Sequence, residues 1–217
     1  MTETWDLSSV RASYDTVAVD YARLLGTALF GKPLDRAMLA AFAEYVRGDQ
    51  AGGGRAVADL GCGPGRVTAH LDSLGVRAFG VDLSPAMVAV ARRTYPGLRF
   101  EVGSMAALDV ADGVLGGVLA WYSTVHTPPA ELPPVLAEFA RVLAPGGHVL
   151  IAFDAGDRKI RLEHAYGHPV ALDVYGTPPD LIAGLLAGAG LTEVGRLVRE
   201  PDGNEKSPQG FLLARKG

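Results

Sequence analysis

Residues 55–65 read R-A-V-A-D-L-G-C-G-P-G, an apolar run that ends in an acid and three alternating glycines. The apolar positions Val57, Ala58 and Leu60 suit a central strand that is covered on both faces. The glycines lie between this strand and a helical segment, where a chain without Cβ atoms can approach a ligand closely. An ordinary tight turn that binds nothing is the alternative interpretation. Asp59 ends the strand, at the edge of the sheet where ligands of open α/β proteins bind.

The composition is that of a compact, acidic protein. The chain has 217 residues, 48% hydrophobic and 20% charged, with a formal net charge of −4 and a pI near 5.7. No Lys/Arg cluster forms a basic stripe, so we expect no nucleic acid partner. No apolar segment is long enough for a membrane span, and the first residues lack the order of a secretion signal. Cys62 is the only cysteine, which excludes an internal disulfide and favours a cytoplasmic location. Abundant alanine, glycine, arginine and proline with scarce lysine is typical of a GC-rich bacterial genome.

Strand and helix patterns alternate along most of the chain. Further strands are predicted at 77–83, 98–102, 114–122 and 148–153, with helices between them. Such β-α repeats predict a parallel sheet with helices on both faces and right-handed crossovers. The last two predicted strands, 191–199 and 210–215, follow each other without a helix, so we expect them to pair antiparallel.

Four stretches, in this order, resemble the class I S-adenosylmethionine-dependent methyltransferases of small molecules: V-A-D-L-G-C-G-P-G at 57–65, G-V-D-L-S-P-A-M at 80–87, E-V-G-S-M at 101–105 and R-V-L-A-P-G-G-H-V-L at 141–150. The glycine loop is G-x-G-x-G rather than the G-x-G-x-x-G of nicotinamide and flavin enzymes. The resemblance implies a Rossmann-like α/β fold, with a seven-stranded, mostly parallel sheet, an antiparallel C-terminal strand pair and helices on both faces. It also implies a single methyltransferase domain over 1–217, with a helical lid at 1–50, a cofactor-binding core at 51–217 and a lid-like insertion at about 155–178.

The resemblance further implies the cofactor S-adenosyl-L-methionine. Asp82 ends the second strand, where its carboxylate suits the two ribose hydroxyls. Asp59 is expected to fix the loop or to attract the cofactor's ammonium group. Tyr14 is expected to reach the site from the N-terminal helix, and Tyr21 either to do so or simply to pack. The expected cofactor residues are Tyr14, Asp59, Gly61, Cys62, Gly63, Gly65, Asp82, Leu83, Met87, Gly103, Ser104, Met105 and Ala120. Met87 equally suits a helix core, and Cys62 a small space-filler.

The methyl acceptor is expected after the fourth strand, where the chain reads A-W-Y-S-T-V-H-T-P-P at 120–129. Trp121 and Tyr122 are candidates for the walls of a site for a flat or apolar acceptor. His126 titrates in the range of a general base, and we take His126 and Tyr122 as the candidate catalytic residues. The alternative is that the two aromatic residues cover the sheet edge and His126 caps the following helix.

A second candidate for acceptor contacts is L-E-H-A-Y-G-H-P at 162–169. Its substrate candidates are His164, Tyr166 and His168, and a solvated loop is the alternative interpretation. The two histidines are four residues apart, but Gly167 and Pro169 disfavour the continuous helix that would present both to a metal, so no metal is expected.

The predicted function is transfer of a methyl group from S-adenosylmethionine to an oxygen, nitrogen or carbon atom of a small molecule, by a monomer or homodimer without nucleic acid or membrane partners. Two alternatives remain open from the sequence. One is a nicotinamide-dependent oxidoreductase. The other is a cyclase or a non-methylating protein that binds the cofactor on the same scaffold.

Overall fold

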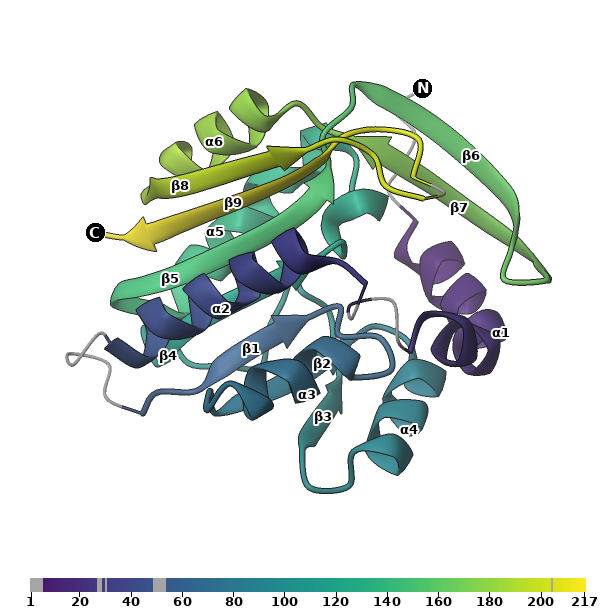
Figure 1. Cartoon of the computed structure of the whole chain (residues 1–217), viewed down its shortest axis with the longest axis horizontal. Helices are drawn as coiled ribbons and strands as arrows, with labels where there is room; N and C mark the ends of the chain where they lie inside the picture. Colours follow the sequence, from purple (N-terminus) through teal and green to yellow (C-terminus); the bar gives the residue numbers. More distant parts are fainter. Residues whose placement is uncertain (1–5, 27–28, 30, 49–53, 204) are drawn as a thin grey trace.

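The computed structural model describes residues 6–26, 29, 31–48, 54–203 and 205–217. Its helices are α1 (Leu7–Leu25), α2 (Pro33–Gly48), α3 (Arg66–Ser73), α4 (Pro85–Thr94), α5 (Leu132–Val142) and α6 (Pro179–Gly188), with short 3-10 turns η2 (Thr124–His126) and η3 (Pro129–Glu131). Its strands are β1 (Val57–Leu60), β2 (Ala78–Asp82), β3 (Arg99–Val102), β4 (Leu115–Trp121), β5 (Leu143–Asp154), β6 (Arg158–Ala165), β7 (His168–Gly176), β8 (Leu191–Arg199) and β9 (Gln209–Lys216). Figure 1 shows these elements along the chain.

Seven strands form one sheet in the order β3-β2-β1-β4-β5-β9-β8. The first five of these are parallel, β9 runs antiparallel to β5, and β8 pairs antiparallel with β9. The predicted fold class, including the antiparallel C-terminal pair, is therefore confirmed. The carboxyl ends of the parallel strands meet at one edge of this sheet, which is where the cavity described below lies.

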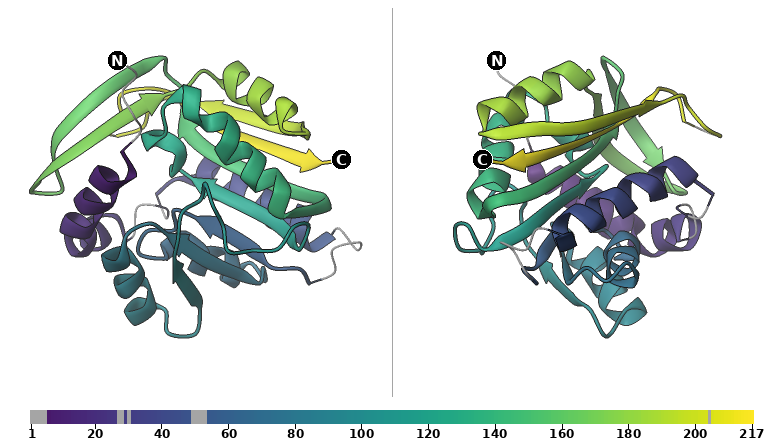
Figure 2. Two further views of the ribbon diagram at one scale, coloured as in Figure 1. Left: turned by 180° about the vertical axis from the view of Figure 1, so that it is seen from behind. Right: turned by 60° about the vertical axis from the view of Figure 1, so that its left-hand side comes forward.

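Helices cover both faces of the sheet, as Figures 1 and 2 show. On one face α2 and α3 pack against strand residues that include Val57, Leu119 and Leu150. On the other face α5 and α6 pack against the alternate positions, among them Ala58 and Val149. Because both faces of the central strands are covered, these strands read as continuous apolar runs rather than as alternating ones.

The start of the fifth strand differs from its prediction. The strand predicted at 148–153 begins earlier, because β5 already starts at Leu143, opposite Leu115 of β4. The register then shifts before His148 pairs with Gly117, and Gly146 has a φ of 80°. The Pro-Gly-Gly sequence thus forms an irregularity within the ladder instead of a turn outside it.

The segment after β5 forms a separate two-stranded antiparallel sheet, the β6–β7 hairpin. It had been predicted only as a lid-like insertion or a solvated loop, because its polar sequence carries no strong strand signal. The hairpin lies alongside α1 beyond the carboxyl ends of the parallel strands (Figures 1 and 2). Ser13 Oγ accepts a hydrogen bond from the backbone N–H of Ala171 at 3.1 Å, and Ser9 Oγ donates one to the Ala171 carbonyl at 3.0 Å.

No helix among the described residues combines the length and the apolar character needed to cross a membrane.

Candidate active site

The glycine loop lies between β1 and α3 and is held to the end of β2. The Gly61 N–H donates to the Val81 carbonyl at 2.7 Å. Gly61 has a φ of 71°, and a Cβ there would lie 2.3 Å from the Cβ of Ser123, so only glycine fits. Gly63 also has positive φ, at 55°, but a Cβ there would meet nothing closer than Tyr21, at 3.9 Å. The loop is thus packed on one side and open above Gly63.

Asp82 lies at the carboxyl end of β2 and orders two turns at once. Its Oδ2 accepts the N–H of Gly63 at 2.7 Å, and its Oδ1 accepts the N–H of Ser84 at 2.8 Å. Burial raises the pKa of this carboxyl, whereas the two backbone hydrogen bonds lower it. Each oxygen retains a further lone pair, so the carboxylate can still accept hydroxyl groups from a ligand.

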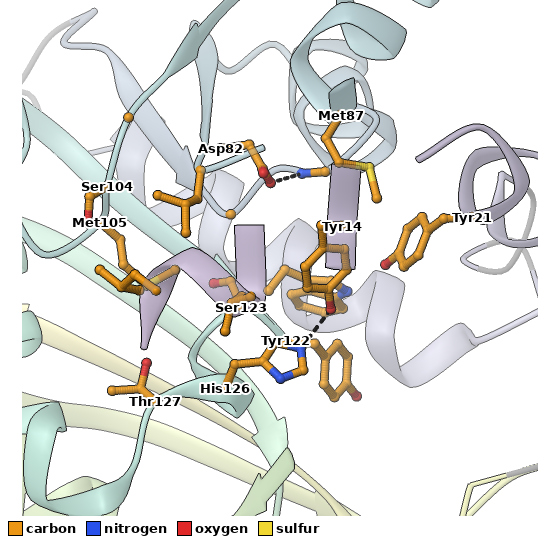
Figure 3. A pocket seen from close by; sticks show the side chains of 17 residues that line it. Tyr14, Tyr21, Asp82, Met87, Ser104, Met105, Tyr122, Ser123, His126 and Thr127 are labelled. Carbon is orange, nitrogen blue, oxygen red and sulfur yellow. Dashed lines mark hydrogen bonds between the residues drawn. The ribbon is translucent and has the colours of Figure 1, made fainter. Parts of the chain in front are cut away.

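A cavity of about 760 Å³, including its open mouth, opens at this edge of the sheet. Residues from α1, the glycine loop, the ends of β2 and β4, and the loops after β3 and β4 line it (Figure 3): Leu7, Val10, Tyr14, Tyr21, Gly61, Gly63, Asp82, Leu83, Met87, Gly103, Ser104, Met105, Trp121, Tyr122, Ser123, His126 and Thr127.

Tyr14 and His126 meet inside this cavity, although 112 positions separate them in the sequence. The Tyr14 hydroxyl lies 2.7 Å from His126 Nε2, as the dashed line in Figure 3 marks. His126 Nδ1 lies 2.7 Å from the backbone carbonyl of Asp173 on β7. A carbonyl oxygen only accepts, so Nδ1 carries a hydrogen, and in the neutral ring Nε2 accepts the proton of Tyr14.

The protonation of this pair follows from its burial. Burial lowers the pKa of His126 from its ordinary value of 6.5, although the hydrogen bond to Asp173 opposes this effect. The pKa of Tyr14 is raised well above 10.0, first by burial and then by Tyr21, Tyr166 and Asp82. At neutral pH the pair therefore consists of a neutral imidazole and a neutral phenol.

Trp121 and Tyr122 contribute rings rather than polar groups to the cavity. Their centroids are 5.7 Å apart, and both pack against Phe211 of β9. Tyr122 has a φ of 55°, an unusual backbone conformation for an aromatic residue. Its hydroxyl is buried, and burial raises the pKa of the phenol far above 10.0. This phenol is therefore protonated at neutral pH, as that of Tyr14 is, and its ring lies at the wall of the cavity, while its part in catalysis stays a prediction.

Asp59 lies behind the loop and does not line the cavity. The Thr68 hydroxyl donates to its Oδ2 at 2.6 Å, while its buried Oδ1 has no hydrogen-bond partner among the described residues. Burial raises the pKa of Asp59 to about 7. Ser123 Oγ, at the cavity, is likewise buried without a partner in the described part of the chain. Two unpaired polar atoms beside an open glycine loop fit a ligand that carries polar groups of its own.

Several predicted site residues lie elsewhere. Gly65, Cys62 and Ala120 are buried beneath the cavity and do not line it. His164 is exposed on β6, Tyr166 stacks against Tyr21 at a centroid distance of 4.9 Å, and His168 Nε2 lies 2.8 Å from Asp20 Oδ2. The three substrate candidates of the hairpin therefore face α1 or solvent, because the hairpin packs against α1 rather than against the sheet. No cluster of three or more metal-binding side chains occurs among the described residues.

Five lining residues were not predicted as site residues. Tyr21 had been left between a site contact and simple packing. It lies about two helical turns beyond Tyr14, on the same face of α1. Ser123 and Thr127 flank the predicted His126, so the whole segment was the better candidate. Leu7 and Val10 gave no signal, because apolar residues at the start of a helix ordinarily indicate packing. All five line the cavity: Leu7, Val10, Tyr21, Ser123 and Thr127.

Comparison with known proteins agrees with this geometry. A family model described as a methyltransferase domain matches residues 57–147. The demethylmenaquinone methyltransferase of Chlorobaculum parvum is 32% identical over 148 residues, which are 67% of this chain and 59% of that protein. The chain belongs to the class I S-adenosylmethionine-dependent methyltransferases.

Further members of this methyltransferase family match over different shares of their length. The trans-aconitate 2-methyltransferase of Methylobacterium nodulans is 41% identical over 96 residues, 42% of this chain and 35% of that protein. The chain thus spans 59% and 35% of the length of these two curated relatives, in both cases less than two thirds. The magnesium protoporphyrin IX methyltransferase of Synechocystis PCC 6803, solved with bound SAH, covers 98% of this chain and 100% of its own, with a TM-score of 0.71 and 16% identity. That likeness establishes the shared methyltransferase fold.

Proposed function

We propose that this chain is an enzyme that transfers the methyl group of S-adenosylmethionine to a hydroxyl oxygen of a small molecule. The observation that carries this proposal is the Tyr14–His126 pair inside the cavity, with its hydroxyl 2.7 Å from the imidazole. An oxygen acceptor must lose a proton as it is methylated, whereas an amine attacks through a lone pair that it already has. A buried base with a defined tautomer therefore favours oxygen over an amine nitrogen.

The fit of the cofactor rests on the polar atoms around the glycine loop. Asp82, at the end of β2, would hold the ribose hydroxyls, and the open backbone at Gly63 would lie against the cofactor. Leu83, Met87, Ser104 and Met105 would enclose the adenine, with apolar walls and one hydroxyl. Asp59 lies behind the loop, so its Oδ1 would attract the ammonium group through water rather than by direct contact.

S-adenosylmethionine supplies an electrophilic methyl group on a sulfonium and leaves as a neutral thioether. The residues of the chain then have two tasks: to align the acceptor and to take its proton. In the proposed step the acceptor hydroxyl donates to Tyr14 Oη while the proton of Tyr14 moves to His126 Nε2. The oxygen–methyl bond forms, the sulfur–methyl and acceptor O–H bonds break, and the positive charge passes from sulfur to the imidazolium. The Asp173 carbonyl accepts from Nδ1 before and after the transfer.

The proposal also covers the segments that enclose the acceptor, the cellular location and the oligomeric state. Helix α1, from the proposed lid at residues 1–50, and the β6–β7 hairpin, within about 155–178, would enclose the acceptor in a single-domain enzyme. The buried Cys62 suits a reducing compartment, so we propose a cytoplasmic enzyme. A monomer or homodimer without nucleic acid partners fits the acidic chain.

The Tyr14–His126 pair can be tested by substitution. We expect His126→Asn to lower kcat by roughly 100-fold, the smaller end of the usual contribution of a general base. Tyr14→Phe should lower kcat by at least about tenfold, because it removes the relay hydroxyl but leaves the imidazole in place. The affinity for S-adenosylhomocysteine, measured by calorimetry, should change less than threefold (roughly 0.65 kcal/mol) in both variants. His164→Asn, an exposed histidine outside the cavity, is the matched control and should behave as the parent.

The proposal also predicts how kcat changes with pH. Because burial places the pKa of His126 below 6.5, the base is neutral above that pKa, and kcat should fall as the pH drops through it. This acid limb should disappear in His126→Asn. An unchanged rate and pH profile in that variant would remove the base from the proposal.

Family membership leaves the nicotinamide oxidoreductase alternative without support. A non-methylating binding protein remains the competing function. Tight binding of S-adenosylmethionine, with no S-adenosylhomocysteine formed across a broad panel of phenols, alcohols and amines, would favour that alternative.

A further inference from the structure

The part of the cavity beyond the glycine loop carries no formal charge among the described residues that line it. This acceptor compartment is formed by α1, the end of β4 and the following turn, from Leu7, Val10, Tyr14, Tyr122, Ser123, His126 and Thr127. Asp82 is the only acidic residue of the whole described lining, and no Lys or Arg belongs to it. Asp82 lies on the side of the glycine loop, where the cofactor is proposed to bind.

The strong cation that lies near Tyr122 is already paired. Arg199 lies near Tyr122 and is only 8% exposed. Its guanidinium bonds the Asp35 carboxylate at 2.8 Å and the Glu205 carboxylate at 2.5 Å. Lys32 also pairs with Glu205, which balances the cluster. An anionic ligand in the compartment would therefore find no unpaired counter-ion from this cluster.

The raised pKa of Tyr14 is a second indication that the compartment disfavours a negative charge. Every shift of the Tyr14 pKa is upward, with burial as the largest cause and the Asp82 charge as another. The surroundings of this hydroxyl thus disfavour a negative oxygen, whether it belongs to the protein or to a ligand. An acceptor hydroxyl is accordingly expected to bind protonated and to lose its proton only during transfer.

The shape and remaining polar groups define the ligand more closely. The rings of Tyr14 and His126 meet edge to face at a centroid distance of 5.4 Å, and Trp121 and Tyr122 do so at 5.7 Å. Leu7 and Val10 add apolar surface from α1. Ser123 Oγ is buried without a partner among the described residues, so it offers a neutral hydrogen bond to a ligand.

We infer that the acceptor is a neutral, flat hydroxy compound, such as a phenol with an uncharged hydrogen-bonding substituent, and that carboxylate-bearing acceptors are excluded. This inference rests on the proposed function, because it assigns the acceptor compartment of that reaction. It specifies the charge and shape that the compartment selects.

Three probes of similar size and different charge test the inference. They are 4-hydroxyacetophenone (neutral), 4-hydroxybenzoate (anionic) and 4-hydroxybenzylamine (cationic). Binding is measured by calorimetry at pH 7.5 on protein saturated with S-adenosylhomocysteine, so no turnover is needed. We expect the neutral probe to bind at least tenfold more tightly than the anion and the cation. Equal or tighter binding of the anion, or no saturable binding of any probe, would overturn the inference.

A charge placed in the compartment should change this selectivity. Val10→Lys introduces a cation on α1 at the lining, and we expect it to improve 4-hydroxybenzoate binding at least tenfold over the parent. Val19→Lys is the matched control, on the same helix but 66% exposed and outside the cavity, and it should leave all three affinities unchanged. Equal effects of the two lysines would show that the net charge of the protein, and not a charge inside the compartment, sets the affinity for 4-hydroxybenzoate. That result would contradict the inference.

The outcomes also separate this inference from the proposed function. If the neutral probe binds most tightly but no O-methylated product forms from any hydroxy compound tested, the proposed reaction is wrong and the charge selectivity stands. If O-methylation occurs but anionic acceptors are preferred, the reaction stands and the inference is wrong.

Discussion

The carboxylate of Asp82 binds the backbone of two different turns, which changes how its substitution must be interpreted. It accepts one N–H from the glycine loop and one from the start of α4. Removing it would both disorder the loop and delete the proposed ribose contact. The residue thus combines an architectural and a ligand-binding role at one position.

We expect Asp82→Ala to reduce the affinity for S-adenosylhomocysteine at least tenfold, which is about 1.4 kcal/mol, because charge-assisted hydrogen bonds are lost. Calorimetry on protein with a parental circular dichroism spectrum measures this. Asp15→Ala is the control, since Asp15 also accepts a backbone N–H at this edge, from Ala86, but does not line the cavity. Unchanged affinity in a folded Asp82→Ala protein would withdraw the ribose assignment.

Asp59 is a buried carboxyl whose Oδ1 has no hydrogen-bond partner among the described residues, and its burial destabilises the charged form. Its pKa is raised from 3.8 to about 7 by burial, even though the Thr68 hydroxyl lowers it. A raised pKa means that the folded protein holds this proton more tightly than the unfolded chain does. The contribution to stability is complete below the unfolded pKa, and is lost as the pH rises through the folded value.

We therefore expect Asp59→Asn to flatten the pH dependence of stability between about pH 4 and pH 7. The difference in unfolding free energy between variant and parent should change across this interval by up to about 4 kcal/mol, in favour of the variant at the higher pH. Urea unfolding at several pH values measures it. Parallel stability profiles for the two proteins would show that Asp59 does not titrate in this range.

At the scale of elements, α1 and the β6–β7 hairpin are held together by contacts at the hairpin turn and the first half of β7. Ser9 and Ser13 bond the backbone of Ala171, the ring of Tyr166 packs on Tyr21, and His168 pairs with Asp20 at the turn end of β7. Tyr166 has a φ of 54°, a conformation that the turn imposes and that these contacts help to hold. We therefore propose that the two elements act together as one cover over the cavity.

The His168–Asp20 contact should control how firmly this cover is closed. The hydrogen bond from His168 is the largest cause that lowers the pKa of Asp20 below 3.8. Its stabilising contribution is thus present at neutral pH, and is lost as the pH falls through the lowered pKa of Asp20.

We expect His168→Ala to speed hydrogen exchange at the backbone amides of α1 and of the hairpin turn severalfold, with little change in Tm, because a polar contact this exposed contributes little to global stability. Mass spectrometry of exchanged peptides measures this. His164→Ala, an exposed histidine on the same hairpin, is the control. Equal exchange in both variants would mean that the contact does not hold the cover.

At the scale of the whole molecule, the sheet was predictable, whereas the strands of the 155–178 insertion and their packing on α1 were not. The buried strands that carry Asp59 and Asp82 at their carboxyl ends have a strong pattern, because apolar runs and glycine turns report local backbone requirements. The absence of a helix between the last two strands was enough to predict their antiparallel pairing. These features depend on neighbours in sequence.

The remaining features depend on contacts between distant segments. The strands at 158–165 and 168–176 are polar and half-exposed, since they pack on α1 rather than in the core, so their sequence resembles that of a loop. The meeting of Tyr14 with His126 requires α1 to cross the carboxyl edge of the sheet, and no local pattern encodes that crossing. The histidine was predicted from its place after the fourth strand, but its partners became visible only in three dimensions.

The hydrogen bond that fixes the His126 tautomer has a consequence for mutational scans. Its acceptor is the main-chain carbonyl of residue 173, which every amino acid possesses. The Asp173 side chain is engaged elsewhere, with Lys159 and Arg161, both at 3.1 Å. Replacing Asp173 would alter those surface pairs and keep the carbonyl, so a library of side-chain substitutions would overlook this acceptor. An ester in place of the amide that follows residue 173, made by semisynthesis, would weaken the acceptor itself.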